Sequence, residues 1–196
     1  MPQPPIVLAS TSPARLALFR AAGIACTGVA PDVDESRIQA PTPPELAMAR
    51  AAAKAGSIQA SGAVVIGADQ VAHLDGAAFG KPTSVEDHRT RLRQLRGRTH
   101  TLTTAVVLIL DARRLSLQVD AHVRFRADLT DAELDAYVAT GEGSGCAGGY
   151  AVEGLGANLI AAIDGDYFGV LGIPVLDVLT ALRGLGWRPT FPPPPS

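Results

Sequence analysis

Two long strand-like runs that follow each other directly are the feature that most constrains the fold of this chain. Residues 99–110 are mostly threonine and apolar side chains, residues 115–125 alternate apolar with polar side chains, and only four residues separate them. So short a connection suits an antiparallel pair, because parallel strands need a crossover of a dozen or more residues. The sequence therefore predicts a sheet with at least one long antiparallel pair.

The rest of the chain alternates short apolar runs with signals for helices. Strands are predicted at residues 6–9, 63–68 and 159–163, an extended segment at 24–30 and a hairpin turn at 74–76. Helices are predicted after Ser12, after the capping boxes at 42–45 and 130–133, at 84–96 and at 174–185. This alternation, combined with the antiparallel pair, predicts an α/β fold with a mixed, twisted sheet and flanking helices.

Length and composition are compatible with an ordinary globular enzyme. The 196 residues are 47% hydrophobic and 18% charged, with a net charge of −2, which favours neither nucleic acid nor an anionic membrane as a partner. We expect one domain over residues 1–188 and a Pro-rich tail over 189–196. Two cysteines, Cys26 and Cys146, give no disulfide framework, and no leader or apolar run of about eighteen residues is present, so we expect a cytoplasmic protein.

Two further patterns have ordinary interpretations. The arginines at positions 89, 91, 93, 96 and 98 alternate with Leu92 and Leu95, as expected for the solvated face and cap of a helix. The segment from Gly143 to Gly148 has the spelling G-x-G-x-x-G, but it follows a predicted helix and opens none, which argues against a dinucleotide site.

A single carboxylate after an apolar run is the first candidate for chemistry. Asp69 follows residues 64–68, and Lys81 lies twelve residues further on. Lys54 and Lys81 are the only lysines beside fifteen arginines, and a compact ammonium suits phosphate oxygens. These residues predict a hydrolytic site for a phosphoanhydride, in which Asp69 acts as a base or as a metal ligand. The alternative is an aspartate that only opens a turn.

Two other segments offer groups for the same chemistry. From Ser10 to Arg15 a predicted strand turns into a helix, and free N–H groups at a helix start favour a phosphate; a plain N-cap is the alternative. The carboxylates of Asp32, Asp34 and Glu35 suit Mg²⁺ or Mn²⁺, and otherwise lie in a surface loop.

Six short motifs occur in an order that resembles the Maf family. They are Ser10-Thr11-Ser12-Pro13-Ala14-Arg15, Asp34-Glu35, the helix with Lys54, the run from Gly67 to Val71, Gly80-Lys81-Pro82, and the run from Ala147 to Gly154. The stretches 163–167 and 170–174 are similar to the C-terminal signature of that family, so the resemblance extends over about residues 6–185. Maf proteins are septum-formation-inhibitor-like nucleoside triphosphate pyrophosphatases.

The resemblance implies an elongated, two-lobed, inosine-triphosphatase-like fold with a strongly twisted sheet and a central cleft. It implies hydrolysis of a nucleoside triphosphate to a monophosphate and pyrophosphate, with Asp69 as proton acceptor and Mg²⁺, Mn²⁺ or Co²⁺ held by Glu35 and Asp69. Phosphate contacts are expected from Ser10, Ser12, Arg15, Lys54 and Lys81. We also expect no nucleic-acid partner, and a homodimer is compatible with the resemblance.

Positions Ala14, Gln70 and Glu153 correspond to residues that tune substrate choice in this family. Gln70 with Glu153 is similar to the 7-methyl-GTP subfamily, whereas the dTTP/UTP subfamily usually has threonine and glutamine there and an arginine where Ala14 stands. Related 7-methyl-GTP enzymes can carry a bulky aromatic residue at the Ala14 position, so stacking on the base is expected from Tyr150 or Phe168 instead. We therefore expect a preference for 7-methyl-GTP.

Two alternatives remain open at this stage. The first is a dTTP/UTP pyrophosphatase of the same family, and the second is a nucleotide-binding regulator of septum formation without essential catalysis. A regulator needs no complete set of Arg15, Lys54, Asp69 and Lys81, so the presence of all four favours an enzyme.

Overall fold

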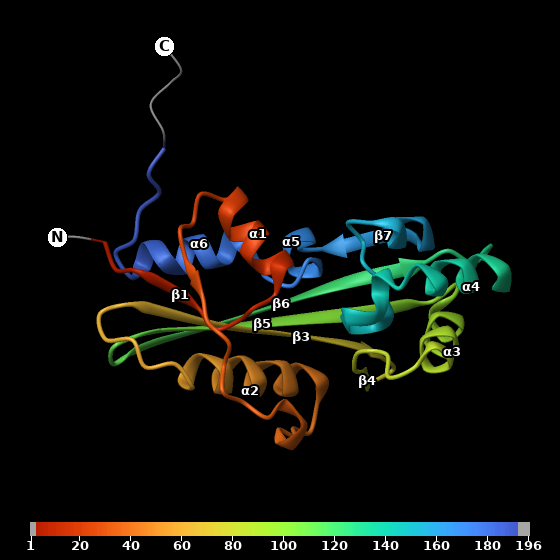
Figure 1. The fold of residues 1–196 in the computed structure, drawn as a ribbon, viewed down its shortest axis with the longest axis horizontal. Helices are drawn as coiled ribbons and strands as arrows, with labels where there is room; N and C mark the ends of the chain where they lie inside the picture. Colours follow the sequence, from red (N-terminus) through yellow and green to blue (C-terminus); the bar gives the residue numbers. More distant parts are fainter. Residues whose placement is uncertain (1–2, 192–196) are drawn as a thin grey trace, which may run out of the picture.

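The computed structural model describes residues 3–191, which form one mixed sheet with helices on both faces (Figure 1). The seven strands are β1 (Ile6–Leu8), β2 (Thr27–Gly28), β3 (Val64–Leu74), β4 (Ala77–Phe79), β5 (Thr99–Leu110), β6 (Arg113–Phe125) and β7 (Ile160–Gly165). Their order is β2-β1-β3-β5-β6-β7, with β4 paired to β3. β1 is parallel to both β2 and β3, and the remaining pairs are antiparallel.

The predicted antiparallel pair is confirmed. β5 and β6 pair continuously from Thr99 with Arg124 to Leu110 with Arg113. The connection is shorter than the four residues expected, because Arg113 and Arg114 join the ladder and leave only Asp111 and Ala112 in the turn. Asp111 has a φ of 51°, which aspartate tolerates better than most residues.

The predicted end of a strand at residue 68 is wrong. β3 continues to Leu74, so Asp69 lies in the middle of an eleven-residue strand, opposite Ala105 of β5. Strand pairing is made by the backbone, and the long partner β5 keeps β3 extended through its polar residues. In the extended segment 24–30, only Thr27 and Gly28 pair as a strand.

The helices begin where the capping signals predicted. They are α1 (Pro13–Ala21), α2 (Pro43–Gly56), α3 (Val85–Leu95), α4 (Asp131–Thr140), the short α5 (Tyr167–Val170) and α6 (Val175–Gly184). Both predicted capping boxes form, with Thr42 and Glu45 at the start of α2 and Thr130 and Glu133 at the start of α4. Short 3₁₀ turns cover Glu35–Arg37, Glu142–Gly145, Ala147–Gly149 and Leu155–Leu159.

The helices divide the molecule into two lobes along the long strands (Figure 1). Near the termini, α2 covers one face of the sheet, while α1 and α6 cover the other. At the opposite end, α3 and α4 pack with the far halves of β3, β5 and β6 around a separate core. β3, β5 and β6 extend through both lobes, so side chains near the middle of these strands lie between them.

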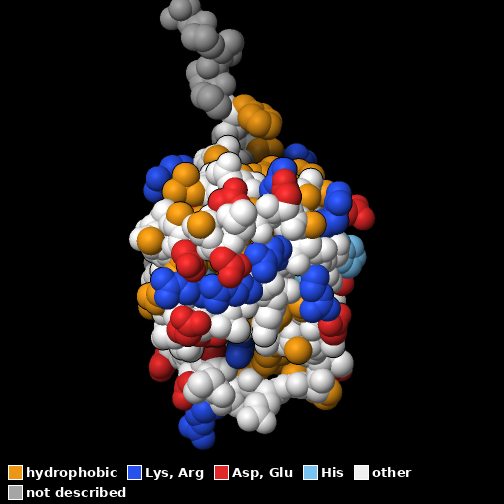
Figure 2. Space-filling view, turned by 90° about the vertical axis from the view of Figure 1, so that its right-hand side faces the viewer, with side chains coloured by type: hydrophobic (Ala, Val, Ile, Leu, Met, Phe, Trp, Pro, Cys, Tyr) orange, Lys and Arg blue, Asp and Glu red, His pale blue; other side chains and the backbone are white. Residues whose placement is uncertain are grey.

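Arginine and aspartate side chains alternate over the end of the molecule formed by α3 and α4 (Figure 2). Arg89 pairs with Asp135 at 3.0 Å, and Arg96 pairs with Asp131 at 2.8 Å. This confirms the solvated arginine face expected from the sequence, with the exception of Arg91, which is buried. Within residues 3–191, no helix combines the length and hydrophobicity required to cross a bilayer.

Candidate functional site

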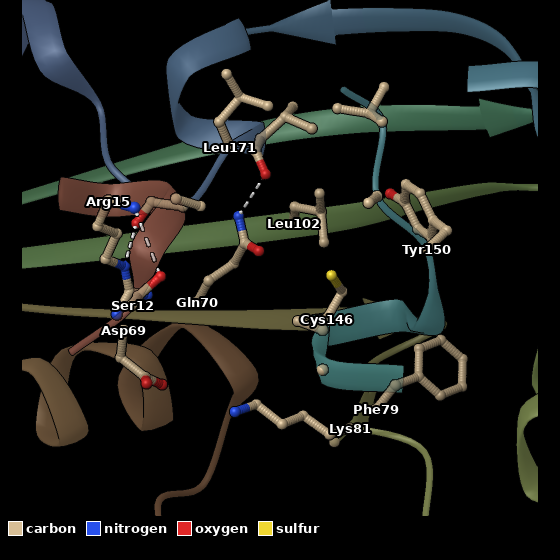
Figure 3. A pocket seen from close by; sticks show the side chains of 18 of the residues that line it. Ser12, Arg15, Asp69, Gln70, Phe79, Lys81, Leu102, Cys146, Tyr150 and Leu171 are labelled. Carbon is tan, nitrogen blue, oxygen red and sulfur yellow. Dashed lines mark hydrogen bonds between the residues drawn. The ribbon is translucent and has the colours of Figure 1, made fainter. Parts of the chain in front are cut away.

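A cleft with a volume of about 560 Å³ lies between the two lobes (Figure 3). It brings together nine of the ten side chains to which the sequence gave a catalytic, metal, phosphate or specificity role, and one of the two aromatic side chains expected to stack on the base. These lining residues are Ser12, Ala14, Arg15, Glu35, Lys54, Asp69, Gln70, Lys81, Tyr150 and Glu153. Ser10 and Phe168 are not among the residues that line it.

A buried lysine with two carboxylates forms the floor of the cleft. Lys54 Nζ lies 2.6 Å from Asp69 Oδ1 and 2.9 Å from Glu35 Oε1. Lys54 and Asp69 are 6% and 5% exposed, whereas Glu35 is half-buried. The second carboxylate oxygen of Asp69, Oδ2, is buried and has no hydrogen-bond partner among the described residues. An unpaired buried oxygen is costly, so it marks a position where a ligand, water or ion is needed.

A close approach of α2 to β3 makes this contact possible. Gly67 lies two residues before Asp69 and points to the same face of the sheet. A Cβ at Gly67 would lie 2.9 Å from the Cβ of Ala55 and against the backbone of Ala51, so no larger residue fits without moving the helix. The small alanines of α2 and this glycine therefore bring Lys54 within reach of the strand.

The two carboxylates of the floor differ in their electrostatic surroundings. Burial raises the pKa of the Asp69 carboxyl, although the charge and hydrogen bond of Lys54 act in the opposite direction. Burial also acts to raise the pKa of Glu35, but there the Lys54 hydrogen bond and the charges of Lys54, Arg50 and Lys81 prevail, and the pKa is lowered. Glu35 is thus held as an anion, while Asp69 is the better proton acceptor.

The start of α1 lines the cleft and is the segment expected to contact phosphate. Ser12 caps the helix by accepting the N–H of Arg15, and Ser10 accepts the N–H of Ser12 at 3.1 Å. Ser10 is buried and shapes this turn from behind. Arg15 Nε donates to the carbonyl of Gly172 at 2.9 Å, which holds the guanidinium at the edge of the cleft.

Gln70 and Glu153 also line the cleft. The amide nitrogen of Gln70 donates to Gly169 O at 2.7 Å, Val170 O at 3.1 Å and Thr104 Oγ1 at 3.0 Å. Because its NH₂ group is engaged by these acceptors, Gln70 presents its amide oxygen to the cleft (Figure 3). Glu153 is exposed and lines the cleft from the loop after α4.

Of the two aromatic residues expected to stack on a base, only Tyr150 lines the cleft. Its hydroxyl is 2.8 Å from His100 Nε2, so the ring is fixed in place and its polar end faces the core. Phe168 packs instead against the core near the termini. Phe79 contributes a second ring to the cleft, which sequence reasoning missed.

Sequence reasoning also missed Arg50. It lines the cleft one helical turn before Lys54, and its Nε is buried without a hydrogen-bond partner in the part of the chain that the structure describes. The spacing of four residues on a helix places Arg50 and Lys54 on one face, and this spacing was the available signal. Cys146 also lines the cleft, where burial raises the pKa of its thiol.

The site has a donor set compatible with a hard divalent cation. No cluster of three or more His, Cys, Asp and Glu side chains suited to a metal occurs within residues 3–191. Mg²⁺ is commonly held by one or two carboxylates together with substrate phosphates and waters. Glu35 and Asp69 provide two carboxylates that both pair with Lys54. Asp69 Oδ2 has no partner among the described residues, so these residues fit such an ion. Asp34 is used differently, since it caps the turn at Ser36.

Comparison with known proteins agrees with this geometry. The chain is 44% identical to a nucleoside triphosphate pyrophosphatase of Streptomyces coelicolor, over 96% of this chain and 98% of that protein. It is 40% identical to a dTTP/UTP pyrophosphatase of Thermus thermophilus, over 95% and 98% of the two chains. It is also 40% identical to a 7-methyl-GTP pyrophosphatase of Brucella abortus, over 91% and 94%. The family described as Maf-like protein matches residues 5–185, and the chain therefore belongs to the Maf-like proteins.

Proposed function

We propose that this protein is a nucleoside triphosphate pyrophosphatase that hydrolyses the α–β phosphoanhydride and prefers 7-methyl-GTP. The observation that supports the hydrolytic role best is the buried Asp69 at the floor of the cleft, which has one oxygen on Lys54 and the other without a hydrogen-bond partner in residues 3–191. Relatives that match over nearly the whole chain carry the name of this activity.

Asp69 is the proton acceptor in this proposal. Lys54 holds Oδ1 and so fixes the orientation of the carboxylate, while Oδ2 accepts the proton of the attacking water. Burial of Asp69 strengthens its basicity, and the hydrogen bond from Lys54 keeps it ionised before the water arrives. The same residue is available as a metal ligand, so one carboxylate orients the water in either case.

Four cationic side chains are available to neutralise the triphosphate. Arg15 and Lys81 line the cleft, as do Arg50 and Lys54 on α2. A divalent cation, when bound at Glu35 and Asp69, supplies further neutralisation of the developing charge on the phosphoryl oxygens. Hydrolysis of an anhydride depends mainly on such positioning and neutralisation, so an enzyme that catalyses it is expected to hold several cations in fixed positions.

Selection of the base is assigned to Gln70 and Glu153. Guanine presents N1–H and N2–H₂ as adjacent donors, and the carboxylate of Glu153 offers two matching acceptors. The amide oxygen of Gln70 is another acceptor, because its NH₂ group is already engaged by Gly169 and Val170. Uracil and thymine would need a donor opposite each ring carbonyl, which neither side chain provides. Methylation at N7 makes N1–H more acidic and strengthens its bond to Glu153.

The two subfamily names occur among relatives of equal identity, so overall similarity does not select the substrate. We expect kcat/KM measured by pyrophosphate release to be highest for 7-methyl-GTP among 7-methyl-GTP, GTP, dTTP and UTP. Glu153→Gln should lower the preference for 7-methyl-GTP over dTTP and UTP by about tenfold, since one acceptor becomes a donor. Higher kcat/KM for dTTP or UTP in the parent protein would contradict the substrate assignment.

Metal dependence is tested with the same assay. We expect EDTA to abolish pyrophosphate release and added Mg²⁺, Mn²⁺ or Co²⁺ to restore it, because the cationic side chains alone leave the charge of the triphosphate insufficiently neutralised. Full activity in EDTA would remove the cation from this proposal.

A further inference from the structure

Helix α3 buries two polar side chains that none of the roles proposed above uses. His88 and Arg91 are 3% and 9% exposed and lie one turn apart, whereas Arg89 and Arg93 on the same helix make ion pairs at the surface. An arginine is rarely buried without specific partners. Each of them binds a backbone carbonyl in one of two segments that line the cleft.

Arg91 holds the segment that carries Lys81. Its Nη1 donates to the carbonyl of Gly80, the residue directly before Lys81. The guanidinium also lies 5.6 Å from the centre of the Phe79 ring, and its Nη2 donates to Asp87. β4 ends at Phe79, so this segment has left the sheet where Arg91 binds it.

His88 holds the segment that carries Tyr150 and Glu153. Its Nε2 lies 2.5 Å from the carbonyl oxygen of Gly149, and because a carbonyl only accepts, Nε2 carries the proton. The His88 ring also makes an edge contact with Tyr137 of α4, with ring centres 6.2 Å apart.

The two segments also meet directly over α3. Gly149 has a φ of +85°, and a Cβ placed there would lie 2.9 Å from His88 Cδ2 and 3.3 Å from Pro82 Cγ. Pro82 follows Lys81, so the segment that carries Lys81 and the ring of His88 both lie against Gly149, in the segment that carries Glu153.

We propose that His88 and Arg91 are positioning residues that hold the two walls of the cleft, residues 79–82 and 145–153, as one unit. They set the distance between Lys81, to which phosphate binding is assigned, and Glu153, to which recognition of the base is assigned, without touching the substrate. The identity of the ligand groups rests on the proposed function, but the coupling of the two walls does not.

Hydrogen exchange measured on the intact protein tests the coupling without any assay of activity. His88→Asn shortens the side chain so that its amide no longer reaches Gly149, and His88→Gln restores that reach. Arg91→Lys keeps the charge but loses the forked geometry, and Arg93→Lys on the exposed face is the matched control. His88→Asn and Arg91→Lys should each speed exchange about tenfold in both walls, while His88→Gln and Arg93→Lys leave both near parental rates.

The proposal would be overturned if each variant sped exchange only in the wall that its own side chain contacts, or in neither wall. Kinetics provide the functional readout: His88→Asn and Arg91→Lys should each raise the KM for 7-methyl-GTP several-fold with a smaller change in kcat, because the walls bind and do not react. A fall in kcat alone would contradict a positioning role. If the parent protein hydrolyses no nucleotide, the proposed function fails while the exchange result still decides the coupling.

Discussion

At the scale of single residues, Lys54 determines the character of the site. It is buried and bonded to both Asp69 and Glu35, at 2.6 and 2.9 Å. A lysine suits this position because its compact ammonium donates in three directions, whereas an arginine would present a planar fork. The arrangement keeps two carboxylates close together and leaves Asp69 Oδ2 unpaired within the part of the chain that the structure describes.

We predict that Lys54→Met lowers both activity and stability. Loss of the ammonium leaves two neighbouring carboxylates without their counter-charge, which should reduce the free energy of unfolding by about 3 kcal/mol at neutral pH. The matched variant Lys81→Met removes an exposed ammonium, so it should lower kcat/KM and leave the free energy of unfolding nearly unchanged. Denaturant unfolding of both variants is the measurement, and equal stability of Lys54→Met and the parent would show that the buried pair is not structural.

At the scale of secondary structure, the packing of α2 on β3 positions the floor of the cleft. The start of α2 was predictable because its capping box is local in sequence, and Thr42 and Glu45 form it as expected. The length of β3 was not predictable in the same way, because Asp69 stays in the strand through pairing with β5 more than thirty residues away. Contacts between distant segments have no local signal, so strand ends are harder to predict than helix starts.

We predict that Gly67→Ala pushes α2 away from β3. The added methyl would meet the backbone of Ala51 and the side chain of Ala55, and overpacking of this kind costs about 1–3 kcal/mol. It should also lower kcat, since Lys54 moves away from Asp69. Gly56→Ala near the end of the same helix is the control, because a methyl there meets nothing within 4 Å. If Gly67→Ala and Gly56→Ala lost equal stability, the close approach of α2 to β3 would not have the role proposed for it.

At the scale of the whole molecule, the cleft exists because long strands join two separately packed lobes. The sequence motifs indicated most of its charged residues, since each lies in a short recognisable segment. Arg50, Phe79 and Cys146 were missed because the cleft is lined by segments from α2, β4 and the loop after α4, and only the fold brings these together. Phe168 was assigned by its aromatic ring alone, and the packing of α5 places it in the core near the termini instead.

The core of the second lobe should make stability depend on pH. His100 is buried beside Tyr150 and Phe125, and burial, with the charge of His73, lowers its pKa to about 4. An unfolded histidine titrates near its ordinary value of about 6.5, so between these values unfolding takes up a proton and stability falls as the pH falls. The loss is at most about 3 kcal/mol between pH 6.5 and 4.

The comparison with His100→Gln isolates this effect. Glutamine keeps a donor toward Tyr150 but does not titrate, so its free energy of unfolding should depend less on pH over this range than that of the parent. Urea unfolding at pH 7, 6, 5 and 4.5 is the measurement. Parallel curves for the two proteins would show that His100 does not carry the pH dependence.

The most direct test of the proposed chemistry is the rate of pyrophosphate release by Asp69→Asn. Asparagine keeps the shape of Asp69 and can still accept a hydrogen bond from Lys54, but it cannot take a proton from water. We predict that kcat for 7-methyl-GTP falls by about 10² or more while the thermal unfolding midpoint stays near that of the parent. Release of pyrophosphate at a near-parental rate by the folded variant would contradict the assignment of Asp69 as the catalytic base.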